Sequence, residues 1–339
     1  MRAIGVTTYG GPEALTAVEL PDPVAGPGEV LIRVEAAGVA PIDAILRTGG
    51  LAPLYAGLEP PFVPGMDVAG TVVSLGDGVE PDDEVAVGQQ VTAFVDFHGA
   101  DGGYADLMVV PASSAVRAPA GLSAVQAVAP VMNALTARNG LDALASHGLG
   151  AGATVLVTGA AGNVGAYAVT LAHQAGMRVL ALAGADDAAA VRGFGADVVL
   201  ARTDDEAALL AAVHEAAPDG VDAVLDFANL QTRVLPALKD GGWEVVFLPW
   251  TGEAGTDEVE PGSHVTRLDE RGLTVHHCNV RERATDRQAM AALRDGVENG
   301  ELAVRVDTVL PAAQASRAHT LLGEHGRRGR IVLSFPVQS

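Results

Sequence analysis

The segment from Val155 to Gly165 has a composition suited to binding a diphosphate through the backbone. A buried β-branched run enters a turn with glycines at 159, 162 and 165, and a helical stretch follows over 166–176. The first N–H groups of a helix carry partial positive charge, so a pyrophosphate can bind there without a cationic side chain. A second strand near Val179 completes the context that this motif requires, although similar turns also occur for packing alone. The predicted phosphate-binding residues are Gly159, Ala160, Gly162, Asn163, Val164 and Gly165.

The residues after the second strand bear on which dinucleotide is bound. In NAD-binding sites, an acid about 20 residues beyond the turn holds the ribose diol, and Gly184 stands at that place here. Gly184 leaves room for the 2′-phosphate of NADPH, whereas Asp186 and Asp187 would repel it. We expect NADPH and leave NADH open. The arginines that could compensate, or could be plain surface charges, are Arg178, Arg192 and Arg202.

The elements that must position this turn fall into two regions. The first hundred or so residues alternate short β-branched runs with glycine and proline, which predicts a small β-rich barrel. From about Ser123 the composition becomes alanine-rich and helical, and apolar strands then alternate with helices. That alternation predicts a parallel sheet with helices on both faces. A last helix around 312–323 precedes a final strand, Arg330–Leu333.

Composition excludes several classes of protein. The chain has 339 residues, 49% of them hydrophobic, which suits two compact domains. With 21 basic against 42 acidic residues, the net charge of −21 would repel a nucleic-acid backbone. The single cysteine, Cys278, excludes an internal disulfide and a cysteine-rich zinc site. No targeting segment or membrane span is evident, so we expect a cytoplasmic protein without nucleic-acid or membrane partners.

Several motifs in order along the chain resemble the medium-chain dehydrogenase/reductase superfamily, in particular its zinc-independent quinone oxidoreductase branch. The resemblance implies an α/β fold: a GroES-like β-barrel domain plus a Rossmann domain with a doubly wound parallel sheet. It places the barrel at 1–122, completed by 300–339, and the Rossmann domain at 123–299. The matching segments are Met1–Ala3, Gly10–Leu15, Gly38–Asp43, Pro64–Gly70, Gly102–Ala105, Gly159–Gly165 and Gly329–Leu333.

The resemblance also implies where cofactor and substrate bind. NADPH, or NADH, would lie in a cleft, with its nicotinamide bordered by the helix of Asn133 and Thr136 and by the loops 226–229 and 247–250. The further cofactor-binding residues implied are Thr136, Gly184, Phe227, Ala228, Phe247 and Trp250. Those implied for the substrate pocket are Ile45, Tyr55, His98, Asn133 and Trp250, where Trp250 could stack on a flat acceptor or simply pack.

The implied reaction is hydride transfer from NAD(P)H to a quinone or an α,β-unsaturated carbonyl. Negative charge would build on the carbonyl oxygen, and hydrogen-bond donors must meet it. Asn133, Thr136 and the backbone around Ala228 are candidate donors, with Tyr55 or solvent returning the proton. Asp43 is a further catalytic candidate, although an ion pair with Arg47 at helical spacing explains it equally.

Two departures from the family leave a second interpretation open. Many members carry Asn where this chain has Ala40, and Tyr where it has Ile45. One interpretation is that the substrate pocket is simply more apolar. Another is that the protein acts on a specialised biosynthetic intermediate, or that it has lost catalysis and binds nucleotide in a binding or regulatory role.

We predict no metal site. Ala40 stands where metal-dependent relatives place a cysteine ligand, and it cannot bind zinc. In a strand, His276 and Cys278 point to one face and His277 to the other, which separates that cluster. The resemblance further implies a homodimer in which this last strand pairs with its twin near Cys278. Arg327, Arg328 and Arg330 indicate either an approach to the adenosine phosphate or a basic C-terminal surface.

Overall fold

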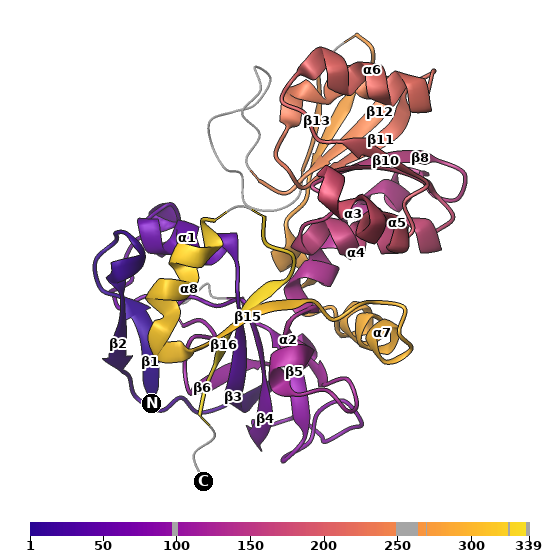
Figure 1. Cartoon of the computed structure of the whole chain (residues 1–339). Coiled ribbons are helices and arrows are strands. Elements are labelled where there is room, and N and C mark those ends of the chain that lie inside the picture. The colour runs from indigo at the N-terminus through magenta and orange to yellow at the C-terminus, as the bar shows by residue number, and fades with distance from the viewer. Residues whose placement is uncertain (97–100, 249–263, 269, 325, 337–339) are drawn as a thin grey trace. The chain divides into compact units, whose positions relative to one another are not determined.

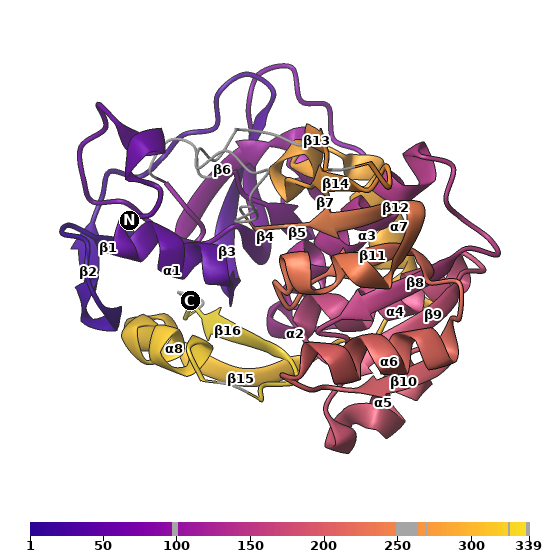
Figure 2. The same ribbon diagram turned by 90° about the horizontal axis from the view of Figure 1, so that it is seen from above.

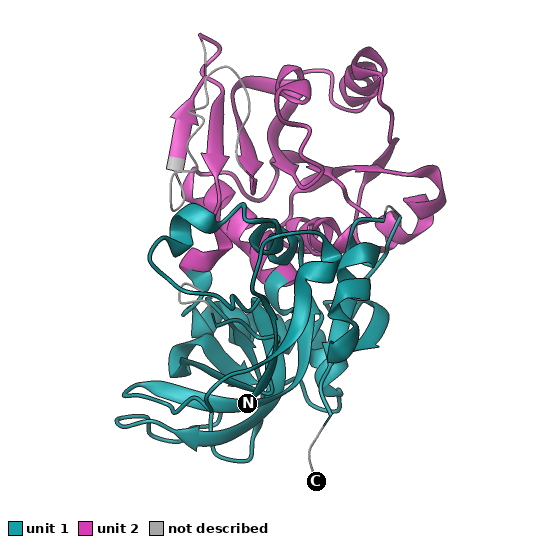
Figure 3. Ribbon diagram, turned by 90° about the vertical axis from the view of Figure 1, so that its left-hand side faces the viewer, with its two compact units in different colours: residues 1–132, 283–339 teal, residues 133–282 magenta. Residues whose placement is uncertain are grey.

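The computed structural model spans residues 1–339 and describes all of them except 97–100, 249–263, 269, 325 and 337–339. The chain divides into two compact units (Figure 3). Residues 1–132 and 283–339 form unit 1, and residues 133–282 form unit 2. Within the described part of the chain, none of the helices combines the length and the apolar character needed to cross a bilayer.

A seven-stranded sheet is the core of unit 1 (Figure 1). Its order is β15-β16-β3-β4-β5-β7, with β6 paired to β3, while β1 and β2 form a separate hairpin. Along β3 the buried Val30, Ile32 and Val34 alternate with half-buried neighbours, the period of a strand with one face in a core. The strands are β1 Arg2–Val6, β2 Leu15–Glu19, β3 Glu29–Val39, β4 Asp67–Leu75, β5 Gln90–Phe94, β6 Leu107–Pro111, β7 Ala115–Arg117, β15 Val306–Pro311 and β16 Arg330–Ser334.

The end of the chain completes this sheet, as the resemblance implied. β16 pairs antiparallel with β3, so that Val332 lies opposite Gly38, and β15 pairs parallel with β16. Helix α8, Ala315–Leu322, packs beside these two strands (Figure 2). Helix α1, Pro41–Thr48, follows β3 directly and ends at Gly49, which has a left-handed φ of 87°.

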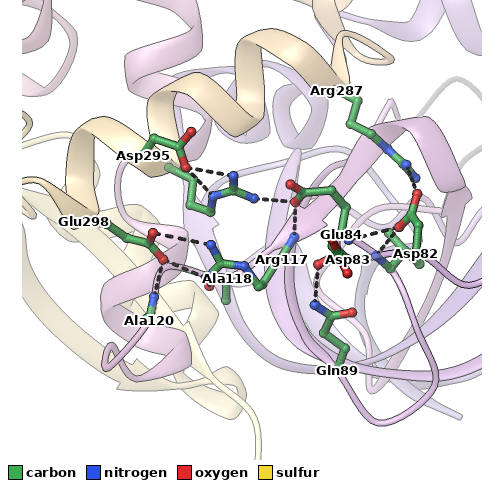
Figure 4. A network of polar contacts seen from close by, with 12 residues as sticks. Asp82, Asp83, Glu84, Gln89, Arg117, Ala118, Ala120, Arg287, Asp295 and Glu298 are labelled. Atoms are coloured by element: carbon green, nitrogen blue, oxygen red, sulfur yellow. Dashed lines mark hydrogen bonds and ion pairs between the residues drawn. The ribbon is translucent and has the colours of Figure 1, made fainter.

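Two helices expected in the Rossmann domain belong to unit 1. Helix α2, Ala124–Val128, buries Ala127 and Val128 in one cluster with Ala36, Ala69 and Val332 of the barrel strands. Helix α7, Arg287–Glu298, is held on the barrel by ion pairs (Figure 4). The predicted boundaries at 122/123 and 299/300 therefore differ from the structural ones, because tertiary packing rather than the alanine-rich composition decides where these helices belong.

Unit 2 is a seven-stranded sheet with the order β10-β9-β8-β11-β12-β14-β13, and only β13 runs antiparallel to its neighbour. Its core gathers Leu156, Leu180 and Val224 from adjacent strands against Leu209 and Val213 of α6. The strands are β8 Thr154–Thr158, β9 Arg178–Ala183, β10 Val198–Ala201, β11 Val221–Asp226, β12 Leu238–Val246, β13 His264–Arg267 and β14 Thr274–His277. The helices are α3 Val131–Ser146, which begins in unit 1, α4 Asn163–Gln174, α5 Ala188–Gly193 and α6 Glu206–Ala216.

The position of β14 corrects one expectation. His276 is paired on one side with Val245 of β12 and on the other with Val265 of β13. Both edges of β14 are thus occupied, so this strand cannot pair with a twin in the way that the resemblance implied. The sequence before β14 has no clear strand pattern and therefore does not predict β13. Among the described residues, β13 is the strand at this edge of the sheet.

Candidate functional site

The glycine turn joins the central strand β8 to helix α4, as predicted. Gly159 has a φ of +59°, a left-handed conformation that glycine adopts without strain. Gly162 is the N-cap residue of α4, and its N–H donates to the Gly159 carbonyl oxygen at 2.9 Å. Asn163, Val164 and Gly165 form the first helical turn, whose N–H groups lack a partner one turn earlier in the helix. The turn therefore presents a helix N-terminus at the carboxyl end of the sheet.

Steric contact explains why Gly165 is glycine. A Cβ atom there would lie 2.2 Å from the Gly159 carbonyl oxygen, whereas at Gly162 it would lie 3.0 Å from the same atom. Helix α4 can therefore approach β8 closely only with glycine at position 165. The N–H of Ala160 donates to the Leu182 carbonyl oxygen at 3.2 Å, so Ala160 ties the turn to β9.

Asn163 supplies an orphaned polar atom at this turn. Its side-chain oxygen Oδ1 is buried and has no hydrogen-bond partner among the described residues. A buried acceptor without a donor is costly unless a ligand or solvent satisfies it. The open helix terminus, the close-approach glycines and this acceptor together fit a dinucleotide, whose pyrophosphate the backbone would hold and whose hydroxyl groups can donate.

A polar network that sequence reasoning missed joins the ends of β8 and β11. The Thr158 hydroxyl donates to Asp226 Oδ1 at 2.6 Å and accepts from the Ala228 N–H at 2.9 Å. Asp226 Oδ2 accepts from the Gln231 N–H at 2.8 Å. This network fixes the loop that carries Phe227. A polar residue as the last member of two apolar strands is the signal that could have revealed it.

The predicted nicotinamide-binding residues of unit 2 lie on neighbouring elements. Phe227 stacks on Phe247 at 4.6 Å with an interplanar angle of 20°. A Cβ on Gly140 of α3 would lie 2.8 Å from Phe247 Cζ, so α3 faces this aromatic pair. Thr136 and Asn133 are one and two helical turns before Gly140 on that face, and both are buried. Trp250 lies outside the described residues, as does His98.

An unpredicted buried carboxyl lies beside this network. Glu244 on β12 has no exposed surface, and neither carboxyl oxygen has a hydrogen-bond partner among the described residues. It shares a register row with Val224 and Val275, on an apolar face of the sheet. Burial, followed by the charge of Asp226, raises the pKa of Glu244 to about 9. Glu244 is therefore a neutral acid at pH 7.

In unit 1, the predicted pocket residues Ile45 and Tyr55 lie on α1 and on the 3-10 turn Ala52–Tyr55. Tyr55 is only 4% exposed, and its ring stacks on Phe62 at 5.0 Å. Ile45 is half-buried. Packing thus accounts for the Tyr55 ring, while the role of its hydroxyl stays a prediction.

Asp43 is a buried structural acceptor rather than the partner of Arg47. Its carboxylate accepts from the N–H groups of Ala40 at 2.8 Å and Gly65 at 2.9 Å, and from the Tyr104 hydroxyl at 3.1 Å. Burial raises the pKa of Asp43 to about 6, against the lowering effect of these N–H donors. Arg47 donates instead to His319 Nδ1 at 3.2 Å, and no Asp43–Arg47 ion pair is present between these two described residues.

Arg330 is not part of a basic surface. Its guanidinium forms a 2.7 Å ion pair with Asp67, and the two side chains are 2% and 0% exposed. Arg327 pairs with Asp307 and with Glu324. The expectation of a solvated C-terminal cluster is therefore wrong for Arg330, because β16 carries it into the barrel.

The described residues contain no group of three or more His, Cys, Asp or Glu side chains arranged to hold a metal ion. At the place where metal-dependent relatives have a ligand, Ala40 is fully buried. In β14, His276 Nδ1 lies 3.0 Å from His147 Nε2, and His147 stacks on Trp243 at 3.6 Å. A ring contact and a hydrogen bond thus account for this histidine pair.

Comparison with known proteins places these features in a family. Residues 26–120 match the family model for the alcohol dehydrogenase GroES-like domain, and residues 194–333 match that for zinc-binding dehydrogenases. A chloroplastic quinone oxidoreductase of Triphysaria versicolor is 34% identical over 98% of both chains. A chloroplast envelope quinone oxidoreductase homologue of Arabidopsis thaliana is 35% identical over 68% of each. A mycobacterial protein solved in complex with NADPH superimposes with a TM-score of 0.80 at 30% identity, covering 98% of this chain and all of the other.

Proposed function

Since this chain belongs to the quinone oxidoreductase branch of the medium-chain dehydrogenase/reductase superfamily, we propose that it transfers hydride from NADPH to a quinone or an α,β-unsaturated carbonyl. It is an NAD(P)H-dependent oxidoreductase by membership of that family. The choice of NADPH is supported by the NADPH complex of the mycobacterial neighbour, and the choice of acceptor by the names of the relatives.

The observation that carries the proposal is the turn around Gly162. The backbone N–H groups of the first turn of α4 would hold the pyrophosphate, and the orphaned Asn163 oxygen could accept from the cofactor. Phe227 and Phe247 would border the nicotinamide, held in place by the network of Thr158 and Asp226. When bound, the nicotinamide would supply hydride to the carbon far from the acceptor carbonyl.

Residues of α3 are further candidate donors to the developing oxyanion. Of the candidates named from the sequence, the Ala228 N–H donates to Thr158 Oγ1 at 2.9 Å. Asn133 and Thr136 lie on the α3 face that meets the Phe247 ring, and each carries a polar group able to donate. We therefore assign the oxyanion contact to Asn133, with Thr136 beside it.

Steady-state kinetics test the proposal. NADPH oxidation would be followed at 340 nm with a panel of benzoquinones, naphthoquinones and linear enones. Turnover with at least one class supports the proposal, and Asn133→Ala should then lower kcat on the order of 10- to 100-fold with little change in the KM for NADPH. Tight NADPH binding without oxidation by any acceptor would contradict it.

That contrary result would favour the second candidate, a nucleotide-binding family member with lost or atypical catalysis. The observation behind this candidate is that Asp43, which accepts from the Ala40 N–H, and Tyr104, which donates to Asp43, are fully enclosed in unit 1. Asp43 and Tyr104 have no exposed surface, and their hydrogen bonds are made within the barrel. Calorimetric binding of NADPH without hydride transfer would distinguish this candidate.

We also infer a homodimer and a cytoplasmic location. Among the described residues β13 is an edge strand of the sheet, and its Val265 is 49% exposed, which supports pairing of this strand between two copies. Light scattering after size exclusion measures the mass. A monomer at micromolar concentration would contradict the dimer.

A further inference from the structure

Glu244 is a buried acid that the proposed reaction does not use. It lies on β12, in the row that crosses the sheet from Val224 on β11 to Val275 on β14. Its side chain has no exposed surface, and both carboxyl oxygens are without a hydrogen-bond partner in the described part of the chain. A buried polar group left in this way costs stability, so its presence calls for an explanation.

The strand register places Glu244 beside Asp226 on one face of the sheet. Val224 pairs with Glu244, and Asp226, two residues further along β11, pairs with Val246. Paired residues of neighbouring strands share a face, and so do residues two apart along one strand. Glu244 and Asp226 are therefore diagonal neighbours on adjacent strands. Asp226 is only 4% exposed, so both acids lie in the interior of unit 2.

The groups that share this face offer the two acids no lasting positive charge within the described part of the chain. The side chains that cover the face are apolar: Leu209, Val213, Val234, Leu235, Val246, Leu268 and Val275. His277 pairs with Val246 and lies on the same face, but an imidazole is uncharged in alkali. Arg233 donates to the Asp204 carbonyl oxygen at 3.0 Å. The titratable residues of α6 are exposed: Glu206, His214 and Glu215.

Asp226 holds the loop 227–231 in a sparsely populated backbone conformation. Two residues of this loop that are not glycine have a left-handed φ, Asn229 at +56° and Gln231 at +48°. Such residues keep this conformation only where surrounding contacts fix them. Here the Asp226 carboxylate accepts from the Gln231 N–H at 2.8 Å, and the Gln231 side chain donates to Asn229 Oδ1 at 2.8 Å. The conformation of the loop therefore depends on Asp226 keeping its place.

The start of this loop lies against the glycine turn. A Cβ on Gly159 would lie 3.4 Å from the Ala228 nitrogen, and the Ala228 N–H donates to Thr158, which in turn donates to Asp226. We propose that protonated Glu244 is a positioning residue for the loop 227–231, and that its ionisation releases the loop and weakens dinucleotide binding. For its ligand, though not for the loop, this inference rests on the proposed function.

Repulsion between two buried carboxylates supplies the mechanism. In a poorly polarisable interior, a second negative charge beside Asp226 is strongly unfavourable. The pair can lower this energy by moving Asp226 away from the N–H and O–H donors that fix the loop, or by admitting water. While Glu244 is protonated, Asp226 is free to accept from those donors. By linkage, a ligand that needs the ordered loop binds the protonated state more tightly.

Dinucleotide affinity as a function of pH tests the proposal. Calorimetry would measure NADPH binding to the full chain from pH 7 to pH 9.5. With a pKa of about 9 for Glu244, the protonated fraction falls to about one quarter at pH 9.5, so the Kd of the wild type should rise about fourfold. Glu244→Gln and Glu244→Met cannot ionise, and their Kd should change less than about twofold. Glu215→Gln, an exposed acid on α6, should follow the wild type.

Hydrogen exchange follows the loop itself, with or without a ligand. Mass spectrometry of the peptide that spans 227–231 should show a severalfold loss of protection in the wild type between pH 7 and pH 9.5, after correction for the intrinsic rate. Glu244→Gln should keep its protection. Circular dichroism of each variant confirms that it is folded.

The outcomes separate this inference from the proposed function. PH-dependent protection that is lost only in the wild type, in a chain that binds no dinucleotide, supports the role of Glu244 in the loop and overturns the proposed function. Binding of NADPH with the same pH profile in the wild type and Glu244→Gln overturns the role of Glu244. An equal loss of affinity at every pH in Glu244→Gln also overturns it, because the side chain would then act through packing and not through its proton.

Discussion

Contacts within the chain require glycine at position 165, whether or not a ligand binds. Its missing Cβ lets α4 lie against the Gly159 carbonyl, and that contact aims the N-terminus of the helix at the carboxyl edge of the sheet. At Gly162, in contrast, a Cβ would lie 3.0 Å from the same oxygen, a smaller overlap. The fold therefore depends more strongly on glycine at position 165 than at position 162, where we expect glycine to leave access for a ligand.

A substitution at each of two helical glycines separates these effects. Gly165→Ala should destabilise the chain by about 1–3 kcal/mol, because a Cβ 2.2 Å from a backbone oxygen forces α4 away from β8. Nucleotide affinity should fall with it. Gly193→Ala in α5 is the matched control, since outside its chain neighbours and its own helix backbone no described atom would lie within 4 Å of the added Cβ, and it should be neutral or slightly stabilising. Urea unfolding measures both. Equal effects at the two positions would refute the steric explanation.

Glu244 predicts a dependence of stability on pH. Its pKa is raised in the folded chain to about 9, while the unfolded chain has the ordinary value of 4.5. Above pH 4.5 the unfolded state releases this proton, while the folded state keeps it. The contribution of Glu244 to the free energy of unfolding is therefore full below pH 4.5 and is lost as pH rises toward 9. The loss amounts to roughly 1.4 kcal/mol per pH unit within that window.

Replacing the carboxyl by an amide removes this slope. Between pH 5 and pH 8, the free energy of unfolding should fall with rising pH less steeply for Glu244→Gln than for the wild type. The two slopes should differ by about 1 kcal/mol per pH unit. Glu215→Gln, an exposed acid on α6, should leave the slope unchanged. Denaturant titrations at four pH values measure the difference. Parallel slopes for Glu244→Gln and the wild type would show that Glu244 does not keep its proton.

Sequence reasoning succeeded at the residues whose role is local and failed at those whose role is tertiary. The glycine turn was predictable because a strand, a turn and a helix adjoin in the sequence. Glu244 was not, since a lone acid in an apolar strand gives no sign that both faces of the sheet are covered. Asp43 and Arg47 have ordinary ion-pair spacing, yet each is bound by residues far along the chain, such as His319.

At the scale of elements, α7 is attached to the barrel by a polar network (Figure 4). Arg117 of β7 pairs with Glu298, and the Glu298 carboxylate also accepts from the Ala120 N–H at 2.7 Å. Arg294 contacts Glu84 and Asp295, and its side chain is only 9% exposed. These contacts connect α7 with segments of the barrel more than 150 residues earlier, which no local pattern could indicate.

The partial burial of Arg294 makes this network worth more than an exposed ion pair. Arg294→Met should lower the free energy of unfolding by about 1–2 kcal/mol, because it removes the ion-pair partner of Glu84 and of Asp295 and leaves the Glu84 carboxylate with the Arg117 N–H as its remaining donor among the described residues. Arg2→Met breaks a pair in which the arginine is 54% exposed, and it should cost less than about 0.5 kcal/mol. Urea denaturation of both variants gives the comparison. A smaller loss for Arg294→Met than for Arg2→Met would contradict this ranking.

The same long-range packing explains why the predicted domain boundaries differ from the limits of the two compact units. The alanine-rich region does begin near Ser123, as its composition indicates, but α2 buries its apolar side against β3 and β4 of the barrel. The pattern of an amphipathic helix predicts that one face is buried, but it does not indicate which surface covers that face. Parallel strands, in contrast, were predictable from their apolar runs, because they are covered on both faces.

At the scale of the whole molecule, unpaired negative charge decides how salt acts on stability. The chain has 42 acidic and only 21 basic residues, so at least half of the carboxylates lack a cationic partner of their own. Their mutual repulsion acts across distances comparable to the Debye length, about 10 Å at 0.1 M salt, and is therefore screened. Close, partly buried pairs such as Arg294–Glu84 are screened much less.

Repulsion should thus dominate at low ionic strength. Raising NaCl from about 10 mM to 150 mM at pH 8 should raise the melting temperature by a few degrees, because screening relieves the net charge of −21 more than it weakens the ion pairs. Choline chloride at equal ionic strength should act alike, since screening does not depend on which cation is present. Differential scanning calorimetry with sucrose as a non-ionic control measures the effect. A melting temperature that falls from the lowest salt upward would mean that the ion pairs, and not the excess of carboxylates, govern the electrostatic stability of the molecule.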